Sequence, residues 1–196
     1  CYAQDPSTSI APNLLNPKSS HKVLDVCAAP GGKTSILSLC MKNKGHLTAT
    51  DLEGPRSNRL IENLENLGVH NVTIPSGDIL NHENPLLTQS NKYDRILIDV
   101  PCSNTGVFRR RVDAKWRLMP GFTKDLARLQ FRMVESIIPL LKEGGKMVYS
   151  TCSIDDEENG QIVAKIIEKF PNLKKIDEVL LIPQEDRDGA YAALLG

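Results

Sequence analysis

Two cysteines carry the most suggestive chemistry in this chain of 196 residues. Cys102 lies in the segment DVPCSNTG and Cys152 in the segment STCS, and each follows a run of aliphatic and β-branched residues that predicts a buried strand. In an open α/β sheet, ligands bind beyond the carboxyl ends of the strands, so both sulfurs are expected to face one crevice. One thiol would act as a covalent nucleophile and the other would handle a proton.

The alternative for any cysteine is that it is a small buried hydrophobic side chain. We assign Cys40 to that class, and Cys27 as well, with at most a backbone contact to a ligand. The flanking proline and threonine, and the position at strand ends, set Cys102 and Cys152 apart.

The segment VLDVCAAPGGKT predicts a strand, a turn of small residues and the start of a helix. Small residues let backbone N–H groups approach a ligand closely, and a helix N-terminus favours negative charge. Cys27 replaces the first glycine of a phosphate loop, Pro30 removes an N–H group, and the glycine spacing of a dinucleotide loop is absent. A single lysine, Lys33, suits a small anion such as a carboxylate. The alternative is an ordinary tight turn between a strand and a helix.

Three acids follow predicted strands: Asp51, Asp78 and Asp99. Asp51 lies about 20 residues beyond the loop, where an acid can accept hydrogen bonds from ribose hydroxyls. Asp78 could accept from an adenine amino group. Each acid alone could instead cap a turn or helix, as Asp51 could before Gly54 and Pro55. Together with the glycine loop, they indicate an adenosine-bearing ligand with a carboxylate and no phosphates, and S-adenosylmethionine fits that description.

The elements that must position these residues alternate between strands and helices, which predicts βαβ units and a mainly parallel sheet. The predicted strands are residues 22–27, 47–50, 72–75, 95–100 and 146–151, with one or two more near the end. The predicted helices are residues 33–41, 55–67, 121–141 and 156–170. We expect Pro139 to kink the third helix and Gly144 and Gly145 to end it. Residues 81–92 are expected to form a polar surface loop, and residues 1–20 a lead-in rich in proline and serine.

The composition indicates one domain in a reducing compartment, most simply the cytoplasm. The five cysteines include no Cys-x-x-Cys pair, which disfavours both a disulfide framework and a zinc site, and we expect no bound metal. No apolar run approaches the ~18 residues of a membrane span. The formal net charge is zero, but residues 103–133 hold eight basic and two acidic side chains. That segment either holds phosphates near the crevice or forms a solvated charged face.

Taken together, several motifs resemble the Sun-type RNA (cytosine-5)-methyltransferase family. They are QDPSTS, AAPGGKT, DVPCSNTG, RRRVDAKW, the Gly144-Gly145 pair and YSTCS followed by Glu158-Asn159. The resemblance runs from about Gln4 to Gly189. It implies a Rossmann-like S-adenosylmethionine-dependent methyltransferase fold: a mainly parallel seven-stranded sheet with helices on both faces and a reversed final hairpin. Residues 21–196 would be the catalytic domain, and the lead-in, residues 1–20, would pack on it.

The resemblance also implies roles for individual residues. Cys152 would attack carbon 6 of a cytosine in RNA, and Cys102 would assist product release. Asp99 could hold the N3 or amino edge of the base. Contacts to S-adenosylmethionine would come from Cys27, Ala28, Ala29, Pro30, Gly31, Gly32, Lys33, Asp51, Arg56, Asp78 and Asp99. The acceptor would be ribosomal RNA first and transfer RNA second.

The chain departs from the family pattern at Asn104, Val112, Glu143 and Ala190, which bears on the shape of the loop around the target base. Trp116 would either stack on a base or cover the crevice. We expect a monomer. The chain begins at Cys1 without methionine, and we expect an N-terminal part with much of the RNA affinity to be missing.

Other functions fit part of the pattern. A DNA cytosine-5 methyltransferase would use Cys102 as the nucleophile. A non-catalytic RNA-binding or assembly module could retain the cofactor pocket. A thiol-redox enzyme is disfavoured by the absence of a Cys-x-x-Cys pair.

Overall fold

In the computed structural model of the protein, residues 3–88 and 92–196 are described. Two sequence-based assignments extend outside these ranges. Cys1 and its neighbour in the lead-in are outside the described residues, and so are residues 89–91 of the predicted surface loop.

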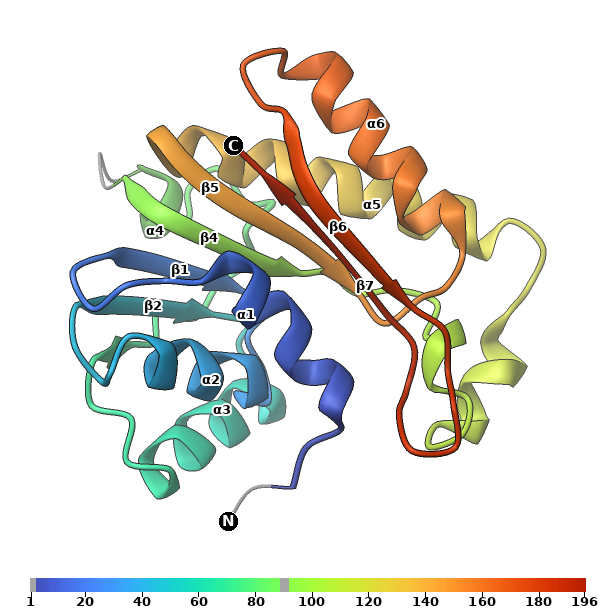
Figure 1. Cartoon of the computed structure of the whole chain (residues 1–196), viewed down its shortest axis with the longest axis horizontal. Coiled ribbons are helices and arrows are strands. Elements are labelled where there is room, and N and C mark those ends of the chain that lie inside the picture. Colours follow the sequence, from blue (N-terminus) through green and yellow to red (C-terminus); the bar gives the residue numbers. More distant parts are fainter. Residues whose placement is uncertain (1–2, 89–91) are drawn as a thin grey trace.

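Seven strands form one sheet in the described part of the chain, in the order β3-β2-β1-β4-β5-β7-β6 (Figure 1). The strands are β1 (Lys22–Val26), β2 (His46–Thr50), β3 (Val72–Thr73), β4 (Tyr93–Asp99), β5 (Leu141–Thr151), β6 (Lys175–Leu181) and β7 (Ala190–Leu195). Neighbouring strands from β3 to β5 pair in parallel, whereas β7 runs antiparallel to both β5 and β6. The predicted methyltransferase-type sheet with a reversed final hairpin is confirmed.

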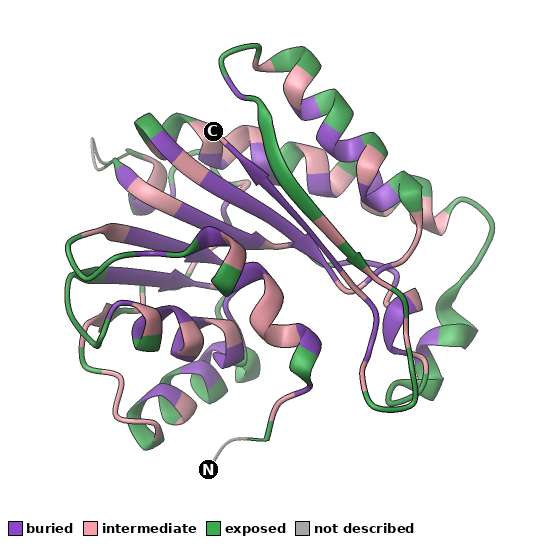
Figure 2. Ribbon diagram, viewed as in Figure 1, coloured by how far each residue is buried: buried purple, intermediate pink, exposed green. Residues whose placement is uncertain are grey.

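Helices cover both faces of the sheet, as predicted. They are α1 (Ile10–Leu15), α2 (Gly32–Cys40), α3 (Pro55–Asn66), α4 (Pro85–Thr88), α5 (Phe122–Ile137) and α6 (Gly160–Lys169). Side chains of α1 and α2 pack with β1, β4 and β5 on one face, where α3 also packs on β2. Side chains of α4, α5 and α6 form the larger core on the other face. The central strands are buried, whereas most of β6, at the edge of the sheet, is exposed (Figure 2).

The prediction for the long helix and its end was wrong. Helix α5 ends at Ile137, a 3-10 turn follows at Ile138–Leu140, and β5 begins at Leu141. Pro139 cannot donate the backbone hydrogen bond that an α-helix needs in its interior, so it ends the helix rather than kinking it. Gly144 and Gly145 therefore lie within β5 and not at a helix end, and β5 is longer than the predicted 146–151.

Other boundaries also differ. The lead-in contains a 3-10 helix, Pro6–Ser9, and then α1, whose Ala11 and Leu15 are buried in the core. The loop predicted at 81–92 includes the short helix α4, and the third strand ends at Thr73. The helix predicted from residue 156 begins with a separate 3-10 turn, Asp156–Glu158. Within the described ranges, no helix has the length and apolar character needed to span a membrane.

Candidate active site

The structure brings the two cysteines into contact. Their sulfur atoms lie 3.1 Å apart, with Cys102 buried and Cys152 half-buried. Both line a cavity of ≈ 1030 Å³ that also contains Asp51, Asp78 and Asp99. Most of the residues predicted to bind the cofactor therefore open onto the same space as the two thiols.

A buried carboxylate holds the loop that carries Cys102. Glu158 is fully buried, and its Oε1 accepts from the Ser103 backbone N–H at 3.0 Å and from Gln130 Nε2 at 2.8 Å. Its Oε2 accepts a short hydrogen bond from the Ser103 hydroxyl. Gln130 also donates to the Pro101 carbonyl oxygen at 3.0 Å, so one network fixes the backbone on both sides of Cys102. The sequence motif included Glu158, but nothing in it indicated this role.

The backbone of the same loop passes very close to Cys152. Gly106 N–H donates to the Cys152 carbonyl oxygen at 3.0 Å, and Gly189 N–H donates to the Gly106 carbonyl oxygen at 2.8 Å. A Cβ atom on Gly106 would lie 2.6 Å from the Cys152 carbonyl oxygen. Only glycine fits there, and its contacts set the distance between the two cysteine loops.

Side chains of neighbouring segments hold the glycine loop through hydrogen bonds to its backbone. Asp51 Oδ2 accepts from the Ala29 N–H at 2.9 Å, and its Oδ1 accepts from the Leu52 N–H at 2.8 Å. Arg56 donates to the Ala29 carbonyl oxygen at 2.9 Å. Asp51 thus caps this loop rather than the helix that begins at Pro55, and it still lines the larger cavity. Cys27, with φ of 61°, turns the chain into the loop.

Asp78 also lines the larger cavity. Asp78 is exposed and accepts from the Leu80 N–H at 2.8 Å, which closes a local turn. Of the predicted cofactor contacts, Ala28, Gly31 and Gly32 do not line this cavity. Ala28 and Gly32 line a separate, smaller cavity.

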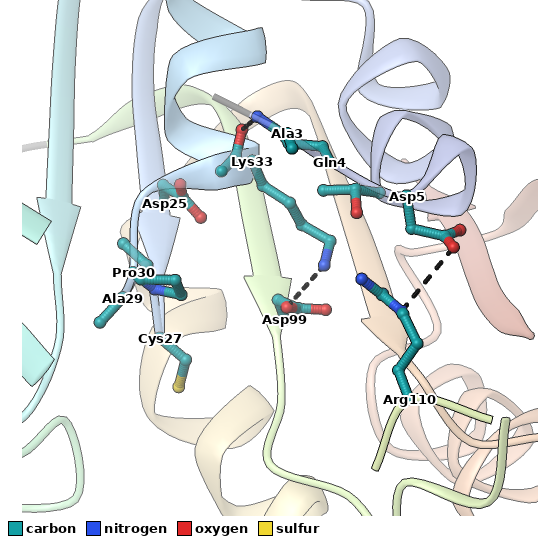
Figure 3. A pocket seen from close by; sticks show the side chains of 13 residues that line it. Ala3, Gln4, Asp5, Asp25, Cys27, Ala29, Pro30, Lys33, Asp99 and Arg110 are labelled. Carbon is teal, nitrogen blue, oxygen red and sulfur yellow. Dashed lines mark hydrogen bonds and ion pairs between the residues drawn. The ribbon is translucent and has the colours of Figure 1, made fainter. Parts of the chain in front are cut away.

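The sequence suggested that Lys33 offers its positive charge to a small anion, but in the structure that charge is already paired. Its Nζ lies 2.7 Å from Asp99 Oδ2 at the end of β4 (Figure 3). Burial acts to lower the pKa of Lys33, but the Asp99 carboxylate outweighs it and the pKa is raised. Lys33 therefore stays protonated, and Cys152 is among the groups close enough to interact with its charge.

A second, smaller cavity of ≈ 220 Å³ lies between the glycine loop and the lead-in (Figure 3). Asp25 and Gln4 line it, and each has one buried oxygen with no hydrogen-bond partner, Asp25 Oδ1 and Gln4 Oε1. The other Asp25 oxygen accepts from the Thr34 hydroxyl at 2.7 Å. Burial, reinforced by the charge of Asp99, raises the pKa of Asp25 to about 7. The sequence analysis missed both residues, although Asp25 stands inside the motif and its position in a buried strand was a signal.

The basic segment divides between structural and cavity-facing roles. Arg109 and Arg110 pair with the buried carboxylates Asp5 and Asp188. Arg110 also lines both cavities, and Arg111 and Arg117 line the larger one. Trp116 is 84% exposed, so the prediction that it covers the crevice was wrong for this structure. Stacking of Trp116 on a base stays a prediction.

Comparison with known proteins places these features in a family. The family described as 16S rRNA methyltransferase RsmB/F matches residues 12–194. The probable ribosomal RNA small subunit methyltransferase B of Bacillus subtilis is 38% identical over 172 residues, which cover 87% of this chain and 38% of that protein. The ribosomal RNA small subunit methyltransferase B of Yersinia enterocolitica is 39% identical over 98% of this chain and 46% of its own length. The chain thus spans less than half the length of these relatives.

A solved structure agrees with this assignment. The crystal structure of NSun6 from Pyrococcus horikoshii with SFG superimposes with a TM-score of 0.89 at 30% identity. The match covers 99% of this chain and 52% of the NSun6 chain.

Proposed function

The chain belongs to the RsmB/F family of 16S rRNA methyltransferases, and we propose that it transfers a methyl group from S-adenosylmethionine to carbon 5 of a cytosine in RNA. The observation that carries the proposal is the contact between Cys102 and Cys152 in a cavity shared with the strand-end acids. Small-subunit ribosomal RNA is the first candidate for the acceptor because the relatives carry that name, and transfer RNA is the second. For the compartment we propose the cytoplasm.

The residues present fit S-adenosylmethionine. The unpaired oxygens of Asp25 and Gln4 need hydrogen-bond donors, and the ammonium group of a methionine supplies them. Asp51 and Asp78 remain as candidates for the ribose and the adenine, with Arg56 near the glycine loop. The SFG in the NSun6 structure is an S-adenosylmethionine analogue, which also supports this cofactor. When bound, the cofactor supplies an electrophilic methyl group on a sulfonium.

The proposed reaction has two steps that can each use a thiol: addition to carbon 6 and removal of the carbon-5 proton. Carbon 5 of cytosine is a poor nucleophile until a thiolate adds to carbon 6, which makes the ring an enamine. We assign that addition to Cys152, because only a thiolate attacks and the Cys152 thiol opens onto the larger cavity. After methylation the carbon-5 proton must leave so that the bond between sulfur and carbon 6 can break. A water that Cys102 positions, or Cys102 itself after its own proton has been lost to solvent, would accept that proton.

Asp99 would orient the base at its N3 or amino edge. Its Oδ2 is held by Lys33, which leaves Oδ1 to accept from the base. The base must leave its stack to reach Cys152, because carbon 6 is hidden between neighbouring bases in a helix.

The assignment of the two thiols is tested with the intact protein, S-adenosylmethionine and substrate RNA. Cys102→Ala is expected to accumulate a covalent protein–RNA adduct that survives denaturing gel electrophoresis, because addition proceeds and release does not. Cys152→Ala is expected to form none. An adduct with Cys152→Ala and none with Cys102→Ala would reverse the roles and favour the thiol order of a DNA cytosine-5 methyltransferase.

The acceptor is tested by bisulfite sequencing of cellular RNA with and without the gene. We expect one or a few cytosines of small-subunit ribosomal RNA to lose protection in the deleted strain. Unchanged protection in every RNA, together with retained RNA binding by the protein, would favour a non-catalytic assembly module.

A further inference from the structure

Asn104 contacts the sulfur of the proposed nucleophile. Its Oδ1 lies 3.1 Å from Cys152 Sγ, and the thiol is the donor in that pair because an amide oxygen has no proton to give. Asn104 also lines the larger cavity beside both thiols.

The orientation of the Asn104 amide is fixed by a second contact. Its Nδ2 donates to the Cys102 carbonyl oxygen at 2.9 Å. The opposite orientation would set the amide oxygen against that carbonyl oxygen and lose the bond. The backbone conformation also suits asparagine at this position. Asn104 has φ of 64° and ψ of 25°, a left-handed conformation that asparagine tolerates better than most residues.

These contacts determine which acceptor each thiol proton faces. The single proton of Cys152 points at Asn104, so the hydrogen bond between the sulfurs uses the proton of Cys102 and a lone pair of Cys152. The hydrogen bond to Cys152, together with burial, raises the pKa of Cys102, which agrees with Cys102 as the donor.

We propose that Asn104 is a positioning residue that holds the proton on Cys152 in the resting enzyme and so restrains the nucleophile. The proposal rests on the proposed role of Cys152. A thiolate at this position would face a lone pair of the amide oxygen at 3.1 Å, which is repulsive. Attack on a base therefore requires the Asn104 amide to turn or the sulfur to move away from it.

Iodoacetamide alkylation tests the proposal on the chain as it stands, without RNA or cofactor. Only the thiolate displaces iodide, so the rate at the Cys152 peptide, followed by mass spectrometry against pH, reports how readily that thiol loses its proton. Asn104→Gly removes the acceptor and suits the left-handed backbone. Asn104→Asp keeps the size and adds a negative charge.

The two variants should shift the pH profile in opposite directions. Asn104→Gly is expected to move the midpoint to lower pH and to raise the rate at pH 7 about two- to five-fold, since one weak hydrogen bond to the thiol form is lost. Asn104→Asp is expected to move it to higher pH and to slow alkylation at pH 7 by roughly ten-fold. A change in access alone would alter the plateau rate and leave the midpoint in place.

Equal midpoints in the native chain and both variants overturn the proposal, provided that thermal melting shows all three folded. The result is separable from the proposed function. Shifted midpoints in a protein that methylates no RNA would keep the role of Asn104 and reject the activity. Methyl transfer with unshifted midpoints would keep the activity and reject the role of Asn104.

Discussion

At the scale of single residues, Asp25 shows how a binding site can oppose stability. Its carboxyl group is fully buried, and one of its two oxygens has no partner. Burial, with the nearby charge of Asp99, raises its pKa to about 7, well above the 3.8 of an ordinary aspartate. The empty hydrogen-bonding capacity faces the smaller cavity, where a ligand cation would satisfy it.

The pH dependence of stability tests this account. Between pH 4 and pH 7 the unfolded chain releases the Asp25 proton while the folded chain keeps it, so this group lowers the free energy of unfolding as pH rises. Asp25→Asn keeps the shape and an acceptor for Thr34 but does not titrate. Relative to Asp25→Asn, the native chain should lose up to ~1.4 kcal/mol per pH unit in this range and stop changing above about pH 8. Urea unfolding at pH 5, 6, 7 and 8 measures it, and parallel curves would contradict it.

Residue types and spacing predicted part of the site and not the rest. The strand-end positions of Cys102, Cys152 and Asp99 followed from local patterns, because each stands directly after an apolar run. The partners of Lys33 and Asn104 did not, since an ion pair or a thiol contact depends on which loops meet in space. Asn104 was noted only as a departure, and its contact with Cys152 joins residues 48 positions apart in the chain.

At the scale of elements, the turn before α6 fixes the loop after β4. Glu158 lies in the 3-10 turn Asp156–Glu158 and receives hydrogen bonds from Ser103 and Gln130. Tyr149 on β5 adds to this network by donating to the Glu158 carbonyl oxygen at 2.6 Å. The loop with Cys102 is therefore set by Gln130 of α5, which bonds to a residue 29 positions earlier, and by Glu158, which bonds to one 55 positions earlier.

Glu158→Gln should destabilise the fold although the side chain keeps its size. The glutamine amide has one acceptor oxygen, whereas three groups donate to Glu158: the Ser103 N–H, the Ser103 hydroxyl and Gln130 Nε2. The NH₂ group of the glutamine would face one or more of these donors without a hydrogen bond. We expect a loss of ~2 kcal/mol in the free energy of unfolding, measured by urea denaturation. Glu157→Gln, at the exposed neighbouring position, is the matched control and should change it by less than ~0.5 kcal/mol. Equal small effects of the two variants would show that the network does not hold the loop.

The sequence predicted the order of elements better than their ends. The alternation of apolar strands with amphipathic helices was sufficient for the parallel sheet. The start of β5 was missed because it depends on the pairing of Leu141 with Tyr93 of β4, and Gly144 and Gly145 lie in the irregular stretch between that pair and the next one. The helix in the lead-in was missed because the proline- and serine-rich segment predicts a loop. Pro12 lies in the first turn of α1, where no backbone N–H is needed, and burial of Ala11 and Leu15 stabilises the helix.

At the scale of the whole molecule, one ionic cluster joins three distant segments. Asp188, which is fully buried, pairs with Arg109 and Arg110, and its N–H donates to Asp5 Oδ1 at 3.1 Å. The cluster ties the lead-in and the turn before β7 to the basic segment that follows Cys102. Arg110, which lines both cavities, owes its position to these carboxylates.

Asp188→Asn should loosen the basic segment. It replaces one of the two carboxylates that face Arg109 and Arg110 with a neutral amide. The segment then opens more often, so trypsin should cut after Arg109–Arg111 roughly three- to ten-fold faster. Asp186→Asn, at an exposed position nearby, is the control and should leave the rate unchanged. Peptide mapping of the early fragments measures both, and an unchanged cutting rate in Asp188→Asn would mean that other contacts hold the segment.

The close approach at Gly106 has a consequence for how such a site can diverge. The scaffold admits no side chain at position 106, because a Cβ atom there would meet the Cys152 carbonyl oxygen at 2.6 Å. Two positions earlier, the side chain of Asn104 lines the larger cavity and contacts the Cys152 sulfur. Natural or laboratory evolution can therefore change the reactivity of the Cys152 thiol through substitutions at position 104. The contact at Gly106, which sets the distance between the two cysteine loops, leaves no such freedom.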